Sequence, residues 1–415
     1  MAKRDVLRAV VVLLFGGILL WGLFQQAGKE PQIYYRLFLL LIPLMLLASL
    51  GLPWASLRKT QRVVLLGVGL LLLARPALEP TLTGRGFVIL SLGWMALSLT
   101  LLVTARRIDW VRIVFMALIL IGSVEALYGL IDVLSSEGAA AHGTFTNRNH
   151  FGGLLNMVIP LSLGGLFATY AGRKSRPLSE IYARAWVILL ACAFMGLGII
   201  LSLSRAASLI LVLTLVLLSI LLALNGPRSG RRSLSGAAAW ILIVLVVGLG
   251  SAMGLDALME RFEDIGEIGP DRGLVYQDTL RLIGDHPLTG VGPGMYEWRF
   301  RPYQTRDAGE WWRHAHNDYL ETAAEWGVPA ALIFWGFILW RFGRAVRLFF
   351  ESTDPWQQGI ALGCAGAVFS ILLHSLVDFN LQMPASLMVF CAVLGLSWTA
   401  DSSTWGTIRG GGRRR

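Results

Sequence analysis

Long apolar runs recur along the whole chain, and they constrain its fold more than any other feature. A helix of about 20 apolar residues crosses a bilayer, where only helices or closed barrels satisfy their own backbone hydrogen bonds. Hydrophobic residues make up 55% of the 415 residues and charged residues only 15%, which lies outside the range of soluble domains. The sequence therefore predicts an all-α integral membrane protein.

The spacing of these runs predicts about twelve transmembrane helices and one large, partly helical loop. Residues 1–255 would carry the first nine helices, 256–318 the loop, and 319–415 the last three helices with a basic tail. The stretch 185–224 has twice the length of one span and contains a single charge, Arg205, so we expect a hairpin that turns there. The expected spans are residues 6–24, 37–52, 63–74, 86–103, 111–134, 151–170, 185–203, 206–224, 237–255, 319–339, 359–373 and 384–400.

Basic residues gather in alternate connecting segments, including 3–8, 58–62, 106–112, 341–347 and 409–415. This is the pattern of cytoplasmic segments, so we expect both termini in the cytoplasm. The formal net charge of +10 then reports topology, and we expect no nucleic-acid binding. The three cysteines, Cys192, Cys364 and Cys391, lie in apolar runs and predict neither a disulfide nor a thiol nucleophile.

Histidines mark the opposite, outer side of the membrane in this topology. An imidazole is the side chain best suited to proton transfer near neutral pH. Chemistry on the outer face is therefore our interpretation, although histidines that merely collect in outer loops are the alternative. The residues are His142, His150, His286, His314, His316 and His374.

Residues 256–318 are rich in aromatic side chains, so we expect this loop to fold. A helix is expected from about Asp271 to Ile283, with Arg272, Tyr276 and Thr279 on one face, an arrangement that suits a diphosphate. An ion pair of Arg272 with a neighbouring acid is an equal alternative. Those acids are Glu267, Asp271 and Asp278.

Further along the loop, the run from Gly290 to Gly294 lacks the spacing of a phosphate-binding loop and predicts a plain turn. Trp298, Trp311 and Trp312 follow, interspersed with arginines. Such residues suit sugars and phosphates, but they are also typical of the lipid headgroup region, which we favour for most of them.

The sequence His314-Ala-His316-Asn317-Asp318 stands directly before the next apolar run, and we expect a helix to begin within it. In an extended approach the two histidines would point opposite ways, so that only one enters a shared site. A catalytic or substrate-facing histidine, a structural histidine and a metal ligand are the three alternatives. A lone His-x-His lacks further ligands at fixed spacing, and we expect no metal.

Arg205 is the other residue that needs an explanation. A charge between apolar spans is costly at the bilayer midplane and much less so near the interface. Its side chain would either reach the interface from the turn or hold an anionic lipid headgroup.

Several separated motifs together resemble the O-antigen ligase/polymerase superfamily of membrane glycan transferases. The resemblance covers residues 143–380, and the order and spacing of the motifs carry it. The motifs are Gly143-Thr-Phe-Thr-Asn-Arg-Asn-His150, Leu203-Ser-Arg205, Arg272 with 285–292, His316-Asn-Asp-Tyr-Leu320 with 325–327, and 374–381.

The resemblance implies transfer of a glycan from undecaprenyl diphosphate to an acceptor hydroxyl on the periplasmic face of the bacterial inner membrane. The reaction would be inverting and independent of metals or other cofactors. His316 would be the general base, while Arg205 and Arg272 would hold the diphosphate. Substrate-binding residues would be His314, Asn317, Asn147, Asn149, Tyr276 and Asp378.

Lipid A-core and another lipid-linked glycan are both acceptors within this superfamily, so ligation and polymerisation stay open. Our first expectation is O-antigen ligation in lipopolysaccharide biosynthesis. A transporter of lipid-linked glycans is the alternative from another class. Transporters often contain internal repeats and midplane polar residues. We find no similarity between the halves of this chain, and its folded loop favours an enzyme.

Overall fold

The computed structural model describes residues 108–135, 140–171, 177–229, 270–305, 311–401 and 405. Within these ranges the chain forms helices and turns without strands, as the all-α prediction requires. Five of the described helices are long and apolar enough to cross a membrane. The expected spans 6–24, 37–52, 63–74, 86–103 and 237–255 lie outside the described residues.

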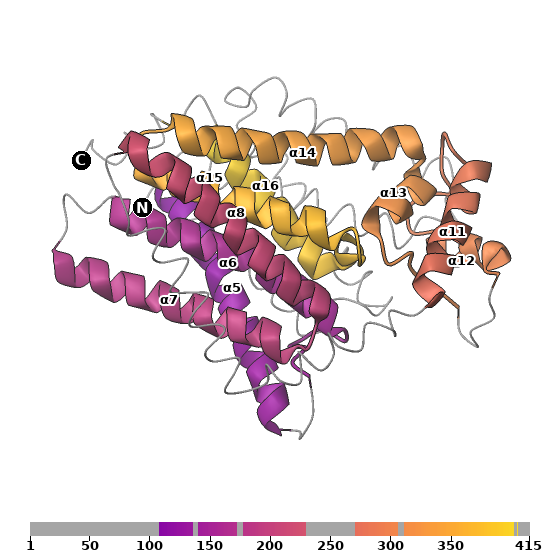
Figure 1. The fold of residues 1–415 in the computed structure, drawn as a ribbon, viewed down its shortest axis with the longest axis horizontal. Helices are drawn as coiled ribbons and strands as arrows, with labels where there is room; N and C mark the ends of the chain where they lie inside the picture. The colour runs from indigo at the N-terminus through magenta and orange to yellow at the C-terminus, as the bar shows by residue number, and fades with distance from the viewer. Residues whose placement is uncertain are drawn as a thin grey trace, which may run out of the picture.

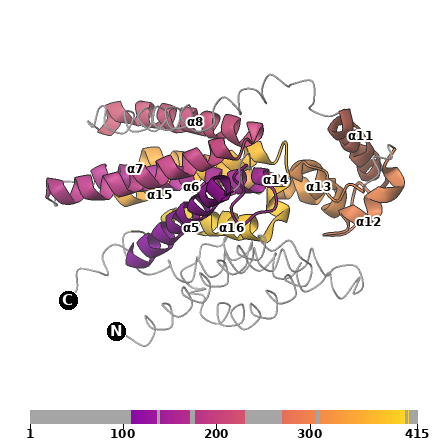
Figure 2. The ribbon, with the colours of Figure 1, turned by 90° about the horizontal axis from the view of Figure 1, so that it is seen from below.

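The described helices form a bundle with a smaller helical unit at one end (Figure 1). The bundle consists of α5 (Ile108–Ser135), α6 (Arg148–Ala171), α7 (Leu178–Leu201), α8 (Arg205–Ser229), α14 (Val328–Glu351), α15 (Pro355–His374) and α16 (Pro384–Ala400). The smaller unit consists of α11 (Pro270–Asp285), α12 (Tyr296–Phe300), the 3-10 turn η5 (Arg301–Tyr303) and α13 (Asp318–Trp326). Another 3-10 turn, η6 (Asn380–Gln382), precedes α16. A turned view shows the same division, with α8 along one edge of the bundle (Figure 2).

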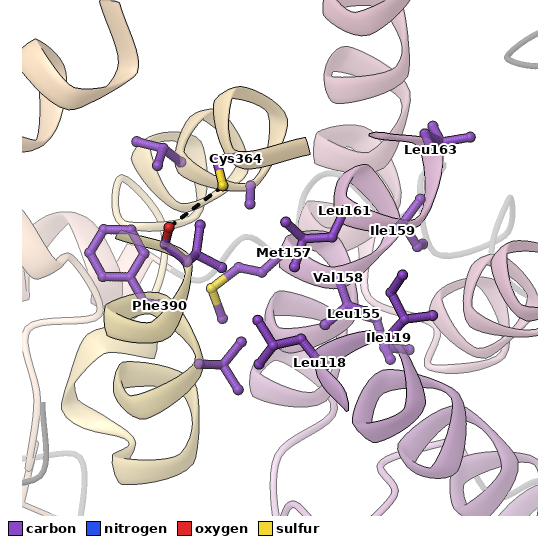
Figure 3. Packing of buried hydrophobic residues seen from close by; sticks show 14 of the residues in the cluster. Leu118, Ile119, Leu155, Met157, Val158, Ile159, Leu161, Leu163, Cys364 and Phe390 are labelled. Carbon is purple, nitrogen blue, oxygen red and sulfur yellow. Dashed lines mark hydrogen bonds between the residues drawn. The ribbon is translucent and has the colours of Figure 1, made fainter. Parts of the chain in front are cut away.

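Helix α6 is the centre of the bundle. Its most apolar 18-residue stretch is 100% buried, and it contacts α5, α7, α8, α15 and α16. Figure 3 shows Met157 of α6 pointing toward Phe390 of α16 and Cys364 of α15. The Cys364 thiol donates to the Val393 carbonyl at 3.5 Å, so this cysteine serves packing between α15 and α16.

Two glycines let α6 and α15 touch through their backbones. A Cβ atom on Gly164 would overlap the Gly359 carbonyl oxygen, and one on Gly359 would overlap the Gly164 carbonyl oxygen. Small residues permit such close approach between membrane helices, where packing rather than water exclusion drives association. This contact fixes the distance between the two helices that carry buried histidines at their ends.

The expected hairpin at Arg205 is present. Helix α7 ends at Leu201 and α8 begins at Arg205. Leu203 makes the turn with a φ of 52°, a conformation that is unusual for a bulky side chain. A backbone hydrogen bond holds this turn, because the Leu203 N–H donates to the Ile200 carbonyl at 2.9 Å.

The single helix expected over 319–339 is wrong, since α13 and α14 divide at Gly327. Gly327 has a φ of 80° and ends α13, and Pro329 stands in the first turn of α14, where its missing N–H is tolerated. Helix α13 therefore belongs to the smaller unit and only α14 to the bundle.

The run from Gly290 to Gly294 forms the expected turn, and it also completes α13. The backbone N–H groups of Val291 and Gly292 donate to the carbonyls of Ala324 and Glu325, at 2.8 and 2.9 Å. These carbonyls lack partners inside a helix end. The smaller unit also has a core of its own, formed by Val275, Leu282, Ile283, Val291, Met295, Tyr296, Phe300, Ala315 and Ala324.

The arginines expected in a cytoplasmic loop after residue 339 lie on α14 instead, because that helix continues to Glu351. Arg341 is fully buried. Its guanidinium donates to the Asp401 carboxylate at 3.2 Å and to the Ser397 hydroxyl at 2.7 Å. This residue therefore ties α14 to the end of α16.

The glycine contact between α6 and α15 predicts that Gly164→Ala lowers the thermal unfolding temperature of the protein in detergent. Overpacking of this kind costs about 1–3 kcal/mol. Gly336→Ala on α14 is the matched control, because a Cβ there meets no atom within 4 Å. Equal unfolding temperatures for the two variants would contradict the role of the glycine contact.

Candidate active site

The loop between α15 and α16, here called the 375–380 loop, collects groups from the other elements. The Asp318 N–H at the start of α13 donates to the Ser375 carbonyl at 2.9 Å. From α11, Arg272 Nη1 donates to the Val377 carbonyl at 3.3 Å. Residues more than 50 and more than 100 positions away in the sequence therefore meet at this loop.

His316 lies against this loop in a strained backbone conformation, with a φ of 51°. Its Nδ1 is 3.5 Å from Asp378 Oδ1. Its ring makes edge contacts with Phe379 and Trp312, at centroid distances of 4.8 and 5.4 Å. The Tyr276 hydroxyl donates to the His316 carbonyl at 3.0 Å, which holds the backbone in place.

Asp378 is buried, and its surroundings favour the charged carboxylate. Burial raises the pKa of this carboxyl, but the imidazoles of His150 and His316 and the Phe379 N–H outweigh burial and hold the pKa well below its usual range. The contact with His316 at 3.5 Å is longer than a charge-assisted hydrogen bond. His316 Nδ1 and Asp378 Oδ2 both lack a hydrogen-bond partner among the described residues.

His314 forms a second pair with a carboxylate. Its Nδ1 is 2.7 Å from Glu321 Oε1, and the other Glu321 oxygen accepts from the Ala315 N–H at 2.9 Å. The His314 ring stacks on Phe379 at a centroid distance of 4.0 Å. Both rings contact Phe379 because His316 adopts a left-handed rather than an extended conformation; which of the two histidines faces substrate stays a prediction.

Asp318 is the other buried acid at this loop, and its electrostatics are the reverse of those of Asp378. Burial and the nearby Glu321 charge raise its pKa well above the usual range, against the hydrogen bonds from Ser375 and Leu381. The Ser375 hydroxyl donates to Asp318 Oδ2 at 2.9 Å. Asp318 thus joins α13 to the 375–380 loop.

Asn317 is the N-cap of α13, and both ends of its amide are in use. Its Oδ1 accepts from the Leu320 N–H at 3.0 Å, and its Nδ2 donates to the Leu376 carbonyl at 3.0 Å. This capping explains why a helix begins within the His-x-His-Asn sequence. The predicted contact of Asn317 with substrate stays a prediction.

The predicted residues on α6 and α8 form a second group. Asn147 caps α6 by accepting from the Asn149 N–H at 2.8 Å. The Asn149 side-chain oxygen accepts from the Ser204 hydroxyl at 2.7 Å, and Arg205 follows at the first position of α8. The motifs containing Asn149 and Arg205 therefore lie side by side.

A buried network joins this second group to the 375–380 loop. Asn380 contacts His150 Nδ1 at 3.1 Å with its amide oxygen and His374 Nδ1 at 3.0 Å with its amide nitrogen. Asn156 of α6 contacts His374 Nε2 at 3.3 Å. The amide of Asn380 thus links the first turn of α6, next to Asn149, with the end of α15.

Two acids on α5, which sequence analysis did not identify, hold the segment before α6. Asp132 accepts from the Gly143 N–H at 2.9 Å, and Glu125 accepts from the Thr144 hydroxyl at 2.8 Å. Their position could have been noticed in the sequence, because an ionisable residue within an apolar span is often functional. Phe379, the ring shared by His314 and His316, had no comparable signal.

The predicted face of α11 is divided between two surroundings. Arg272 and Tyr276 reach the 375–380 loop and the His316 backbone, whereas the Thr279 hydroxyl lies 2.6 Å from the Tyr296 hydroxyl inside the smaller unit. Asp278, one proposed partner of Arg272, is bound by Arg281 at 3.1 Å.

Metal ligands were the third alternative for the His-x-His sequence. Across the described ranges, no group of three or more His, Cys, Asp or Glu side chains is arranged to hold a metal ion. His314 and His316 instead contact different carboxylates. Metal independence of any reaction stays a prediction.

Comparison with known proteins gives one family. Residues 190–335 match the family described as O-Antigen ligase. The matched segment contains Arg205, Arg272, Tyr276 and the sequence from His314 to Asn317, while Asn147, Asn149 and Asp378 lie outside it. No curated protein matches the chain.

The raised pKa of Asp318 predicts a pH-dependent stability. A carboxyl of this kind holds its proton more tightly in the folded state, so stability falls as pH rises from the unfolded pKa of about 4 toward the folded pKa. Asp318→Asn keeps an acceptor for Ser375 and cannot ionise. As the pH rises above about 4, the unfolding temperature of the wild type should fall relative to that of this variant. A difference that does not change with pH would refute the assignment.

Proposed function

Because residues 190–335 of this chain match the O-antigen ligase family, we propose that the protein transfers a glycan en bloc from undecaprenyl diphosphate to an acceptor hydroxyl. The family match and the apolar helices support a multi-pass membrane protein of the glycosyltransferase type. The site would face the periplasm in a bacterial inner membrane, with both termini in the cytoplasm. O-antigen ligation to lipid A-core is the first candidate.

The observation that carries the proposal is His316 beside the buried carboxylate of Asp378. A carboxylate next to one imidazole nitrogen favours a proton there and stabilises the imidazolium that forms when the other nitrogen accepts a proton. The pKa of Asp378 lies below its usual range, so this residue is ionised at neutral pH. The 3.5 Å separation would shorten once the imidazole is protonated.

In the proposed reaction, His316 Nε2 removes the proton of the acceptor hydroxyl. The acceptor oxygen attacks the anomeric carbon of the glycan from the side opposite the diphosphate. The bond from the anomeric carbon to the diphosphate oxygen breaks, and undecaprenyl diphosphate leaves with that electron pair. A single displacement of this kind inverts the anomeric configuration and needs no metal ion or cofactor.

Arg272 and Arg205 would stabilise the charge that develops on the leaving diphosphate. The bond of Arg272 to the Val377 carbonyl holds its guanidinium one residue before Asp378. Arg205 follows Ser204, which is bonded to Asn149. His314, Asn317, Asn147, Asn149 and Tyr276 would position the substrates or the groups that touch them.

His316→Ala should lower glycan transfer by about 10²- to 10⁴-fold, the contribution typical of a general base, while leaving membrane insertion intact. His286→Ala is the matched control, because His286 is an exposed histidine at the end of α11. Transfer is measured with purified protein and a short glycan on undecaprenyl diphosphate. Full activity of the His316 variant would exclude this residue as the base.

The same assay, run with and without lipid A-core, separates the two enzymatic alternatives. A ladder of longer lipid-linked products without core would identify a polymerase, and transfer that requires core would identify a ligase, which is the expected result. If no product forms in either reaction although the lipid-linked donor binds, the transporter alternative gains support.

A further inference from the structure

Two exposed tryptophans and several arginines form a patch on the smaller unit, here called the α12 patch (Trp298, Arg299, Arg301, Trp311 and Arg313). The side chains of Trp298 and Trp311 are 58% and 57% exposed, although a large aromatic residue gains most free energy when buried. None of these five residues has a role in the reaction proposed above. Exposed aromatic area beside arginines is typical of a binding surface.

Arg301 lies between the two tryptophans. Its guanidinium carbon is 4.3 Å from the Trp298 ring centroid and 5.1 Å from that of Trp311. Among the described residues its acidic neighbour is Glu297, at 4.0 Å, and the same carboxylate lies 3.7 Å from Arg313. The aromatic rings thus hold the guanidinium in place, and one shared carboxylate leaves Arg301 and Arg313 with an excess of positive charge.

The position of the patch does not suit the lipid headgroup region that we expected for these residues. Interfacial tryptophans lie at the ends of membrane-spanning helices. Figures 1 and 2 both show α12 at the far end of the smaller unit, beyond α13 and away from the bundle. A ligand in the aqueous space therefore fits this patch better than a lipid surface.

The patch is continuous with the proposed general base. Trp311 is followed by Trp312, whose ring contacts His316 at a centroid distance of 5.4 Å. The Trp312 N–H donates to the Gln304 side chain at 3.3 Å, which fixes this segment against the end of η5. Arg272, which we assign to the diphosphate, instead bonds the 375–380 loop, so we assign the α12 patch to the acceptor.

We propose that the α12 patch binds an anionic, phosphorylated or carboxylated, portion of the acceptor glycan. This inference rests on the proposed function, because it takes the acceptor to be the molecule that meets His316. Sugar rings would stack on the free faces of Trp298 and Trp311, and the anionic group would pair with Arg301 and Arg313. The patch would then orient the acceptor hydroxyl toward the base.

Direct binding tests the proposal without requiring turnover. The probe is a phosphorylated core oligosaccharide freed of its acyl chains, added to the full-length protein in detergent and followed by saturation-transfer NMR and calorimetry. Trp298→Ala and Trp311→Ala should each weaken its binding by about fivefold or more. Enzymatic removal of the phosphates should weaken binding to the wild type but change little in Arg301→Gln.

Trp186→Ala is the matched control, since Trp186 is a comparably exposed tryptophan (61%) on α7. Unchanged oligosaccharide binding in the Trp298/Trp311 double variant would overturn the proposal. So would a double variant that loses affinity only for anionic lipid vesicles, because the patch would then serve the membrane. Patch-dependent binding by a protein that transfers no glycan would support the patch and refute the proposed function.

Discussion

A buried polar loop must find a hydrogen-bonding partner for each of its groups, because unpaired polar groups are costly away from water. Most polar groups of the 375–380 loop meet this requirement with partners from distant parts of the chain, and Asp378 Oδ2 is an exception among the described residues. Asp318 and Asn317 come from α13, Arg272 from α11 and His150 from α6. The hydrogen-bonding needs of this one loop therefore bring the residues of the candidate site together. The glycine contact between α6 and α15 brings these two helices, which carry His150 and His374, close to each other.

Two buried carboxyls at this loop differ in charge because their neighbours differ. Asp378 faces imidazoles and a backbone N–H, which lower its pKa, whereas burial and then the nearby carboxylate of Glu321 raise the pKa of Asp318. A charged acid thus stands beside His316, whereas the acid that joins α13 to the loop holds its proton more tightly than usual.

Local sequence was a good guide wherever local physics dominates. Apolar run length located α5, α6, α7, α8, α15 and α16 closely, and the single charge of Arg205 located the turn of the hairpin. Gly327 and Pro329 could have predicted the break between α13 and α14, but the apolar residues on both sides led us to expect one continuous span. Asn317 was predicted to contact substrate, yet its amide is used as a helix cap, a role that its position before a helix also suggested.

The amino-acid sequence was sufficient to predict the described helices that are long and apolar enough to cross a membrane, because hydrophobic length is a property of neighbouring residues. The site residues that it proposed stay predictions. The tertiary structure decided which acid accompanies which histidine, through one contact within seven residues and one between distant segments. His316 pairs with Asp378, 62 positions later, and His314 with Glu321, since the left-handed turn at His316 directs both rings to Phe379. Side-chain direction after such a turn depends on what packs against it, and that is set by the whole bundle.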